Sequence, residues 1–463
     1  MLDRLFSSSL RTVTINVALH LLLGVVSTIT KFALIGWFYF ILLSGFSILI
    51  NPKKNFTKYA ALLIYLTSYD VISRMAKTSP FIPYELSKYL TVVFALWGLV
   101  NILTNGKKYL FMSILLIPAF FIDQLDITGI DDWVNNGIAP INLGLLVALF
   151  FRQKVSVETL FVYLRLILYT SLMVLAFAYF KTPDYDKIDF KLSANFTTSG
   201  GFGSNQVSTI LGLGGFIITV FLLMGRPLTS FRWADIGLLF AFLLQGLLTF
   251  SRGGMLGMVL AVGVFVFFAS SGVQRNLAIK ISKGKMFLYG LLAIIVGFIG
   301  FIIADNITGN ALSLRYSGET AGTAEGYREK DLNVITSNRV EIYEGDLELW
   351  ASEPFWGVGV GVSKHERSKL KGVVAHVEFS RLLAEHGLFG LIFFTTWLFL
   401  YFKIRKNNQD KVAIAILSAL FVLALFTSFH AAIRTNVTPL LTGMAMMSIV
   451  IPATRNQKPF NIK

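Results

Sequence analysis

The stretch "LLTFSRGGMLGMVLA", residues 247–261, decides how the chain is organised. It is apolar apart from Arg252 and its small neighbours, and apolar runs of this kind recur from residue 12 to residue 452. An α-helix needs about 20 mostly apolar residues to cross a bilayer. Charged residues make up 14% of the 463 residues and hydrophobic ones 55%, whereas a soluble domain has about 25% charged residues. The sequence therefore predicts an all-α, polytopic integral membrane protein.

The apolar runs predict about 12–14 transmembrane helices. The candidate spans are 12–30, 33–50, 57–73, 86–104, 109–122, 138–151, 159–180, 206–224, 233–250, 254–270, 286–304, 387–402, 412–430 and 437–452. Two of them, 109–122 and 138–151, are short enough to be half-helices. We expect four regions: spans 1–194, spans 195–304 with the Ser-Arg-Gly-Gly motif, a large loop 305–386, and spans with a basic tail 387–463.

The charges of the short loops predict the orientation. If both termini are cytoplasmic, the cytoplasmic segments hold 22 Lys or Arg and three Asp or Glu, whereas the short outer loops hold eight of each kind. Basic residues concentrate on the cytoplasmic side of membrane proteins. The net charge of +15 is therefore explained by the bilayer, and we expect no nucleic-acid partner. The chain has no Cys, which excludes thiol redox chemistry and Cys-ligated metals.

The long loop, residues 305–386, is placed on the outer side by the same count. A helix is predicted from Arg339, with Ser337 or Asn338 as its cap, and Pro354 should end it. Its apolar face is predicted to be Val340, Tyr343, Leu347 and Trp350. Long loops with their own helices are usually functional. "GVGVG", residues 357–361, lacks the spacing of a nucleotide-binding loop and is interpreted as a turn that returns the loop to the membrane.

Arg252 is the first candidate site residue. It could be a helix-end anchor, but on the outer face such lone cations are disfavoured, and Gly253, Gly254 and Gly257 allow another helix to approach closely. We favour an anion site at the outer surface. Arg339 could pair with Glu341 or Asp346, or else bind an anion beside its helix N-terminus. Arg434, one turn after His430, could line the same cavity.

Histidines of the loop are the second set of candidates. His365, His376 and His386 lack the spacing of a metal site, so no metal is expected. His376 could serve in packing or as a general base, since neutral imidazole suits that work near pH 7. Arg74 is expected to pair with Asp70, four residues earlier, and is a further candidate for lining the outer cavity.

Four stretches in this order resemble the bacterial O-antigen ligase and polymerase superfamily. They are "GFGSNQVSTILGLG" (201–214), "TFSRGGMLGMVLAV" (249–262), "NRVEIYEGDLELWASEPFWGVGVG" (338–361) and "AHVEFSRLLAEHGLFGLIFF" (375–394). The resemblance covers residues 195–402, and before it the chain matches only in being hydrophobic. Val377 departs from the pattern, because Asn often follows the histidine in ligases.

The resemblance implies a GT-C-like membrane glycosyltransferase in the bacterial inner membrane, with the loop in the periplasm. Its functional residues fall on Arg252, Arg339 and His376. A glycan would pass from undecaprenyl diphosphate to a sugar hydroxyl of lipid A–core or of a growing polysaccharide, with inversion and without cofactor. Arg434, Arg74 and Gly253 are candidate contacts for the diphosphate or lipid. Ligase, repeat-unit polymerase and protein O-glycosylating enzyme stay open, as does a glycan flippase or other transporter.

Overall fold

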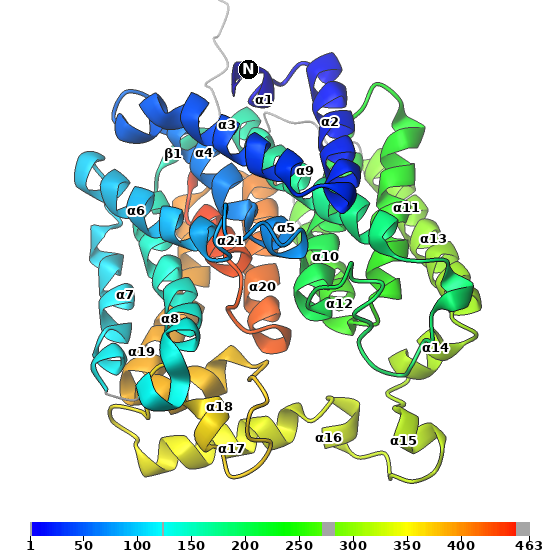
Figure 1. The fold of residues 1–463 in the computed structure, drawn as a ribbon. Coiled ribbons are helices and arrows are strands. Elements are labelled where there is room, and N and C mark those ends of the chain that lie inside the picture. Colours follow the sequence, from blue (N-terminus) through cyan, green and yellow to red (C-terminus); the bar gives the residue numbers. More distant parts are fainter. Residues whose placement is uncertain (1, 123–124, 271–282, 451–463) are drawn as a thin grey trace, which may run out of the picture.

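A computed structural model describes residues 2–122, 125–270 and 283–450, which form a bundle of α-helices (Figure 1). Nine helices in this part are long and apolar enough to cross a membrane. They are α2 (Leu10–Ile29), α3 (Phe32–Ile50), α8 (Leu125–Phe150), α9 (Val157–Lys181), α10 (Ser204–Leu223), α12 (Arg252–Ser270), α13 (Lys283–Ile307), α19 (Glu378–Asn407) and α20 (Lys411–His430). The prediction of an all-α polytopic membrane protein is confirmed.

Several predicted spans are shorter or divided. The shorter helices of the bundle are α1 (Leu2–Leu5), α4 (Phe56–Ser68), α5 (Asp70–Met75), α6 (Leu86–Asn101), α7 (Leu110–Leu116), α11 (Arg232–Leu248) and α21 (Val437–Ala445), with 3-10 turns η1 (Lys107–Tyr109), η2 (Pro118–Phe121) and η3 (Tyr185–Lys187). The span predicted at 57–73 is split into α4 and α5, and the described part of 437–452, residues 437–450, holds only α21 and one strand. Strands β1 (Lys154–Ser156) and β2 (Ser448–Val450) pair in parallel.

The core of the bundle lies around α9 and α10, which are almost entirely buried by other helices. The helices α10, α12 and α20 pack against one another, and α13 lies at the edge against α11. Apolar side chains of α13 such as Phe287 and Ile294 remain exposed, which is expected of a surface that faces lipid. Caps fix several helix starts: Ser156 and Asp410 accept hydrogen bonds from the backbone N–H of Thr159 and Ala413.

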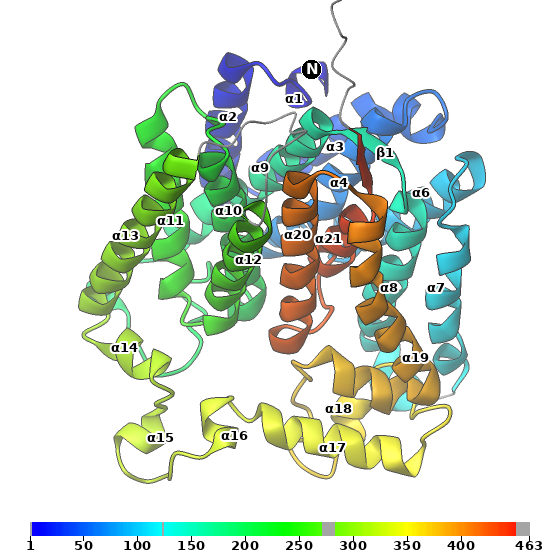
Figure 2. The ribbon, with the colours of Figure 1, turned by 180° about the vertical axis from the view of Figure 1, so that it is seen from behind.

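The loops gather at two ends of the bundle, and which end faces the cytoplasm stays a prediction. Contacts between the side chains of Lys58 and Asp3 and of Arg152 and Asn407 join loops at one end. At the other end, Lys31 donates to the backbone of Ser79, and Lys364 of the long loop pairs with Asp132. The N-terminus lies at the first end and the long loop at the second (Figures 1 and 2).

The long loop contains five short helices below the bundle (Figure 2). They are α14 (Ala311–Tyr316), α15 (Ala321–Ala324), α16 (Leu332–Ile335), α17 (Arg339–Ser352) and α18 (Ser363–Glu366). The glycines of "GVGVG" all have positive φ, and the backbone N–H of Val358 donates to Ala384 at the start of α19. This segment therefore turns the loop back onto the bundle, as predicted.

Candidate active site

Arg252 begins α12 at the end of the bundle that carries the long loop. The preceding turn is tight, with Phe250 at φ 56°, and the backbone carbonyl of Thr249 accepts a hydrogen bond from Asn195. The Arg252 guanidinium donates to the carbonyls of Arg315, at 3.2 Å, and Ile335, at 2.6 Å. The side chain therefore contacts the long loop rather than anchoring the helix end alone.

The glycines after Arg252 allow close packing, as the sequence predicted. A Cβ on Gly253 would lie 2.3 Å from the His430 ring, and one on Gly254 would lie 2.1 Å from the carbonyl of Ser208. Gly257 faces α20, where its Cβ would meet Leu423 and Phe426. Gly253 is buried against His430 and allows α12 and α20 to pack closely, while its contact with lipid or diphosphate stays a prediction.

Replacing Gly253 by alanine should lower the thermal unfolding temperature of the purified protein, because the new methyl group must displace His430. Overpacking of this kind costs about 1–3 kcal/mol. Gly263→Ala is the matched control on the same helix, since no atom would lie within 4 Å of its Cβ, and it should be neutral or slightly stabilising. Equal melting of Gly253→Ala and wild type would contradict the close packing.

Arg339 begins α17, as predicted, but the structure corrects the details of this helix. Asn338 makes no capping hydrogen bond; instead the side chain of Asn333 accepts from the backbone N–H of Glu341. The buried face contains Ile342, Gly345 and Asp346 rather than the predicted apolar residues. The reason is an ion pair of 3.0 Å between Asp346 and the buried Arg367, which directs this face inward.

Arg339 is left without a carboxylate by that arrangement. Its predicted alternative partner Asp346 is bound to Arg367, and Glu341 contacts Asn333. The Arg339 guanidinium donates to the carbonyl of His430 at 3.3 Å, and its buried Nε has no hydrogen-bond partner in the described part of the chain. Its charge is therefore available to a ligand.

His376 lies just before α19 and is joined to the segment after α20. The backbone N–H of Ala432 donates to the carbonyl of His376 at 3.0 Å, and the Arg434 guanidinium donates to the carbonyl of Ala375. On its other side, Nδ1 of His376 lies 3.4 Å from the amide nitrogen of Asn205, at the start of α10. The imidazole is thus held between two walls of the bundle.

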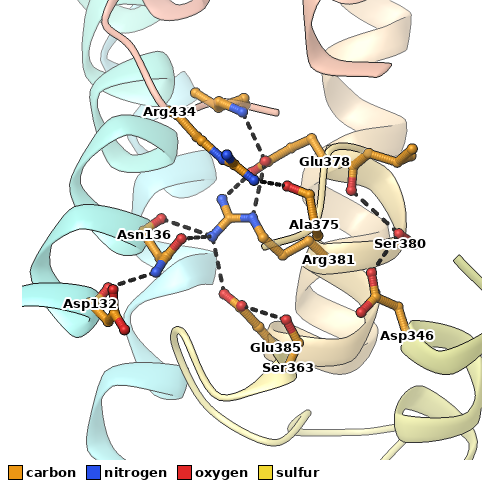
Figure 3. A network of polar contacts seen from close by, with 12 residues as sticks. Asp132, Asn136, Asp346, Ser363, Ala375, Glu378, Ser380, Arg381, Glu385 and Arg434 are labelled. Atoms are coloured by element: carbon orange, nitrogen blue, oxygen red, sulfur yellow. Dashed lines mark hydrogen bonds and ion pairs between the residues drawn. The ribbon is translucent and has the colours of Figure 1, made fainter. Parts of the chain in front are cut away.

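A buried network of polar contacts includes Ala375 and Glu378, on either side of His376 in the chain (Figure 3). Glu378 accepts from the backbone N–H of Ile433 at 2.9 Å and pairs with Arg381 at 2.5 Å. Arg381 also contacts Glu385 and the Asn136 side chain, both at 3.2 Å. Arg381 thus lies between two carboxylates, and the network holds the backbone of residues 375–378 against Arg434.

Arg315 is a further candidate site residue, which was not predicted from the sequence. It is 8% exposed, and its Nη2 donates to the hydroxyl of Ser337 at 3.2 Å. Its Nε and the hydroxyl of the neighbouring Tyr316 are buried without a hydrogen-bond partner among the described residues. Buried polar atoms are normally paired, so these donors are suited to a ligand. The one signal in the sequence is an arginine within the short stretch "ALSLRY".

Arg252, Arg315, Arg339 and Arg434 form what we call the arginine cluster. None of these four pairs with a carboxylate among the residues that the structure describes. Burial, followed by the charges of Arg252 and Arg339, lowers the pKa of Arg315 to about 10. Burial also lowers the pKa of Arg339, with the charge of Arg252 as the second cause. All four remain cationic at pH 7, and an anion would relieve their mutual repulsion.

The charge of the cluster also reaches His376. Burial and then the charges of Arg434 and Arg339 lower the pKa of His376 to about 3, so the imidazole is neutral near pH 7.

Arg74, by contrast, is not brought to the cluster. It pairs with Asp70 at 3.2 Å, as predicted, and also with Glu85, so its charge is compensated elsewhere.

The comparisons with known proteins agree with this arrangement. A family model described as O-antigen ligase matches residues 236–395, a range that contains Arg252, Arg315, Arg339 and His376. None of the curated proteins compared with the chain matches it. The match falls on the helices and the long loop that meet at the cluster. This match supports a relation of the multi-pass membrane protein to the O-antigen ligase and polymerase superfamily.

Proposed function

We propose that the chain transfers a glycan from undecaprenyl diphosphate to an acceptor hydroxyl at the outer face of the bacterial inner membrane, as an O-antigen ligase acting on lipid A–core. The observation that carries the proposal is the arginine cluster, whose members form no ion pair with a carboxylate of the described residues, beside a neutral histidine. Forked guanidinium groups suit phosphate oxygens. A diphosphate is a good leaving group once its charge is stabilised, so we expect no metal to be required.

The proposed reaction is a direct displacement at the anomeric carbon. The acceptor oxygen forms its bond to that carbon while the bond to the diphosphate oxygen breaks, and the electron pair leaves with the diphosphate. Arg252, Arg315 and Arg339 stabilise the charge that develops there. His376 accepts the hydroxyl proton. Attack opposite to the leaving group inverts the configuration.

Asn205 would orient the base in this proposal. Its Oδ1 lies 2.7 Å from the hydroxyl of Ser251 and its Nδ2 faces Nδ1 of His376. An amide can present either atom to a histidine. With Oδ1 facing Nδ1–H, the Nε2 lone pair of His376 is free for the acceptor proton.

A groove on the side of the bundle is suited to the lipid tail of the proposed donor. A cavity of about 600 Å³ lies between α10, α11, α12 and α13 and is lined almost wholly by apolar side chains. Val259 and Phe287 on its rim are exposed toward the region that lipid would fill. Since α12 begins at Arg252, a polyprenyl tail in this groove would leave its diphosphate near the cluster. The α12 residues of the groove differ from Gly253 and Gly257, which face α20.

Deletion of the gene, followed by analysis of the lipid-linked glycans, tests the proposal. A ligase predicts long undecaprenyl-linked chains together with bare lipid A–core, because assembled glycan cannot be transferred. Single repeat units on the lipid would instead indicate the polymerase of the same superfamily. Complementation with the intact gene is the control. Transport of lipid-linked glycan by proteoliposomes, without any glycan transfer, would overturn the enzymatic proposal.

A further inference from the structure

A second cavity, separate from the arginine cluster, opens at the same end of the bundle. Its volume is about 520 Å³, and none of the four cluster arginines lines it. The lining residues are Arg74, Lys77, Pro83, Tyr84, Glu85, Tyr89, Ile130, Asp131, Val134, Asn135, Gly201 and Phe202. They come from the α5–α6 connection, the start of α8 and the segment before α10. We call this the α5–α8 cavity.

The α5–α8 cavity is linked to the region of His376 in two ways, one through the chain and one through a hydrogen bond. Gly201 and Phe202 run directly into the start of α10, where Asn205 faces His376. Behind Arg74, the carboxylate of Asp70 accepts from the backbone N–H of Asn436, two residues after Arg434. The cavity therefore shares walls with the site of His376.

The lining chemistry differs from that of the cluster. Arg74 is compensated by Asp70 and Glu85, and the acidic Asp131 offsets Lys77, so the cavity has no excess charge for an anion. Tyr84 and Tyr89 present aromatic surface, at 46% and 39% exposure. The buried Oδ1 of Asn135 has no hydrogen-bond partner in the described residues. Amide and carboxylate oxygens accept hydroxyl protons, and aromatic faces suit the C–H faces of sugar rings.

The position of the cavity indicates which substrate it would serve. In Figures 1 and 2, α8 and α14 lie on opposite sides of α10, so the cavity at α8 and Arg315 on α14 are separated by the α10 region. In a direct displacement the acceptor must approach opposite to the leaving diphosphate. The α5–α8 cavity is on the side from which an acceptor would then reach His376.

We propose that the α5–α8 cavity is a binding site for the neutral saccharide of the acceptor. This inference rests on the proposed glycan transfer. Tyr84 packs on a sugar ring, while Asn135 accepts a hydrogen bond from a sugar hydroxyl. The donor contributes its diphosphate at the arginine cluster, and its own sugar chain lies outside this cavity.

The test is a steady-state transfer assay with purified full-length protein. Donor lipid and acceptor glycolipid are extracted from cells that lack the gene. Asn135→Ala and Tyr84→Ala should each raise the acceptor KM about tenfold, the effect of losing roughly one hydrogen bond or ring contact, and leave the donor KM unchanged. Tyr179→Ala is the matched control, because this tyrosine is also exposed but does not line the cavity. Thermal unfolding verifies that the variants fold.

A binding measurement separates this inference from the proposed reaction. The saccharide released from the acceptor lipid is titrated into wild type and variants by calorimetry. Binding that weakens about tenfold in both variants supports the site, even if no transfer is found, in which case the proposed function alone fails. A raised donor KM would assign the cavity to the donor's sugar chain and overturn the proposal. Unchanged KM values and unchanged binding in an active enzyme would overturn it equally.

Discussion

Replacing Arg252 by alanine is expected to lower the rate of glycan transfer about 10²–10³-fold, the usual effect of removing one positioned donor from developing negative charge. The Arg252 guanidinium donates hydrogen bonds to two carbonyls of the long loop, and its charge lowers the pKa values of Arg315 and Arg339. Its loss would therefore weaken the cluster as a whole. Transfer is measured in membranes with the protein level matched between variants.

Two further variants test whether the effect of Arg252→Ala is specific to this position and to its guanidinium group. Arg252→Lys keeps the charge but loses the fork of donors, so its activity should fall between wild type and alanine. Arg328→Ala is the matched control, since Arg328 is an exposed arginine of the same loop, and it should transfer normally. Near-normal transfer by Arg252→Ala would remove the cluster from the mechanism, and loss of wild-type activity in chelator would contradict the expectation that no metal is required.

Replacing His376 by alanine should lower transfer about 10²–10⁴-fold, because a general base contributes a factor of that order. His365→Ala is the control: His365 belongs to the same loop but contacts Asp132 at 3.6 Å, on the far side of the Arg381 network. If His376→Ala transferred glycan at the wild-type rate, His376 would not be the general base, and another group would have to accept the proton of the acceptor hydroxyl.

The pH profile tests whether the charge of Arg434 acts on a base at His376. The pKa of about 3 means that the imidazole stays neutral as the pH falls from 8 toward 5, so kcat/KM should not fall through protonation of His376 over this range. Arg434→Gln removes one charge that lowers this pKa. The pKa of His376 should then rise, and the acid limb of kcat/KM, which reports groups of the free enzyme, should move to higher pH. A limb that does not move would contradict the role of Arg434.

The sequence could predict the elements of the site because each carries a local signal. An arginine followed by two glycines at a helix start, an arginine that opens a loop helix, and a histidine before a long apolar run are all visible without a fold. In the structure Arg339 donates to the carbonyl of His430, the charge of Arg252 acts on Arg339, and the charge of Arg339 acts on His376. Their roles in catalysis remain predictions.

Other features depended on contacts that no local pattern encodes. Arg315 joins the cluster because the loop folds back so that its carbonyl meets Arg252. The inward face of α17 is set by the pairing of Asp346 with Arg367, which are far apart in sequence. The division of the span at 57–73 follows from the polar group around Asp70 and Arg74, which makes the helix end early.

The positive charge of the arginine cluster has a consequence for the turnover of the proposed reaction. In the proposed reaction, the lipid diphosphate that remains after transfer of the sugar carries at least as much negative charge as the donor did. The four arginines of the cluster would retain this product as firmly as the substrate. Departure of the spent lipid, sideways into the bilayer along the groove beside α12 and α13, is then the slow event to expect. A phosphatase that shortens the spent diphosphate in the membrane would keep the cluster free for the next donor.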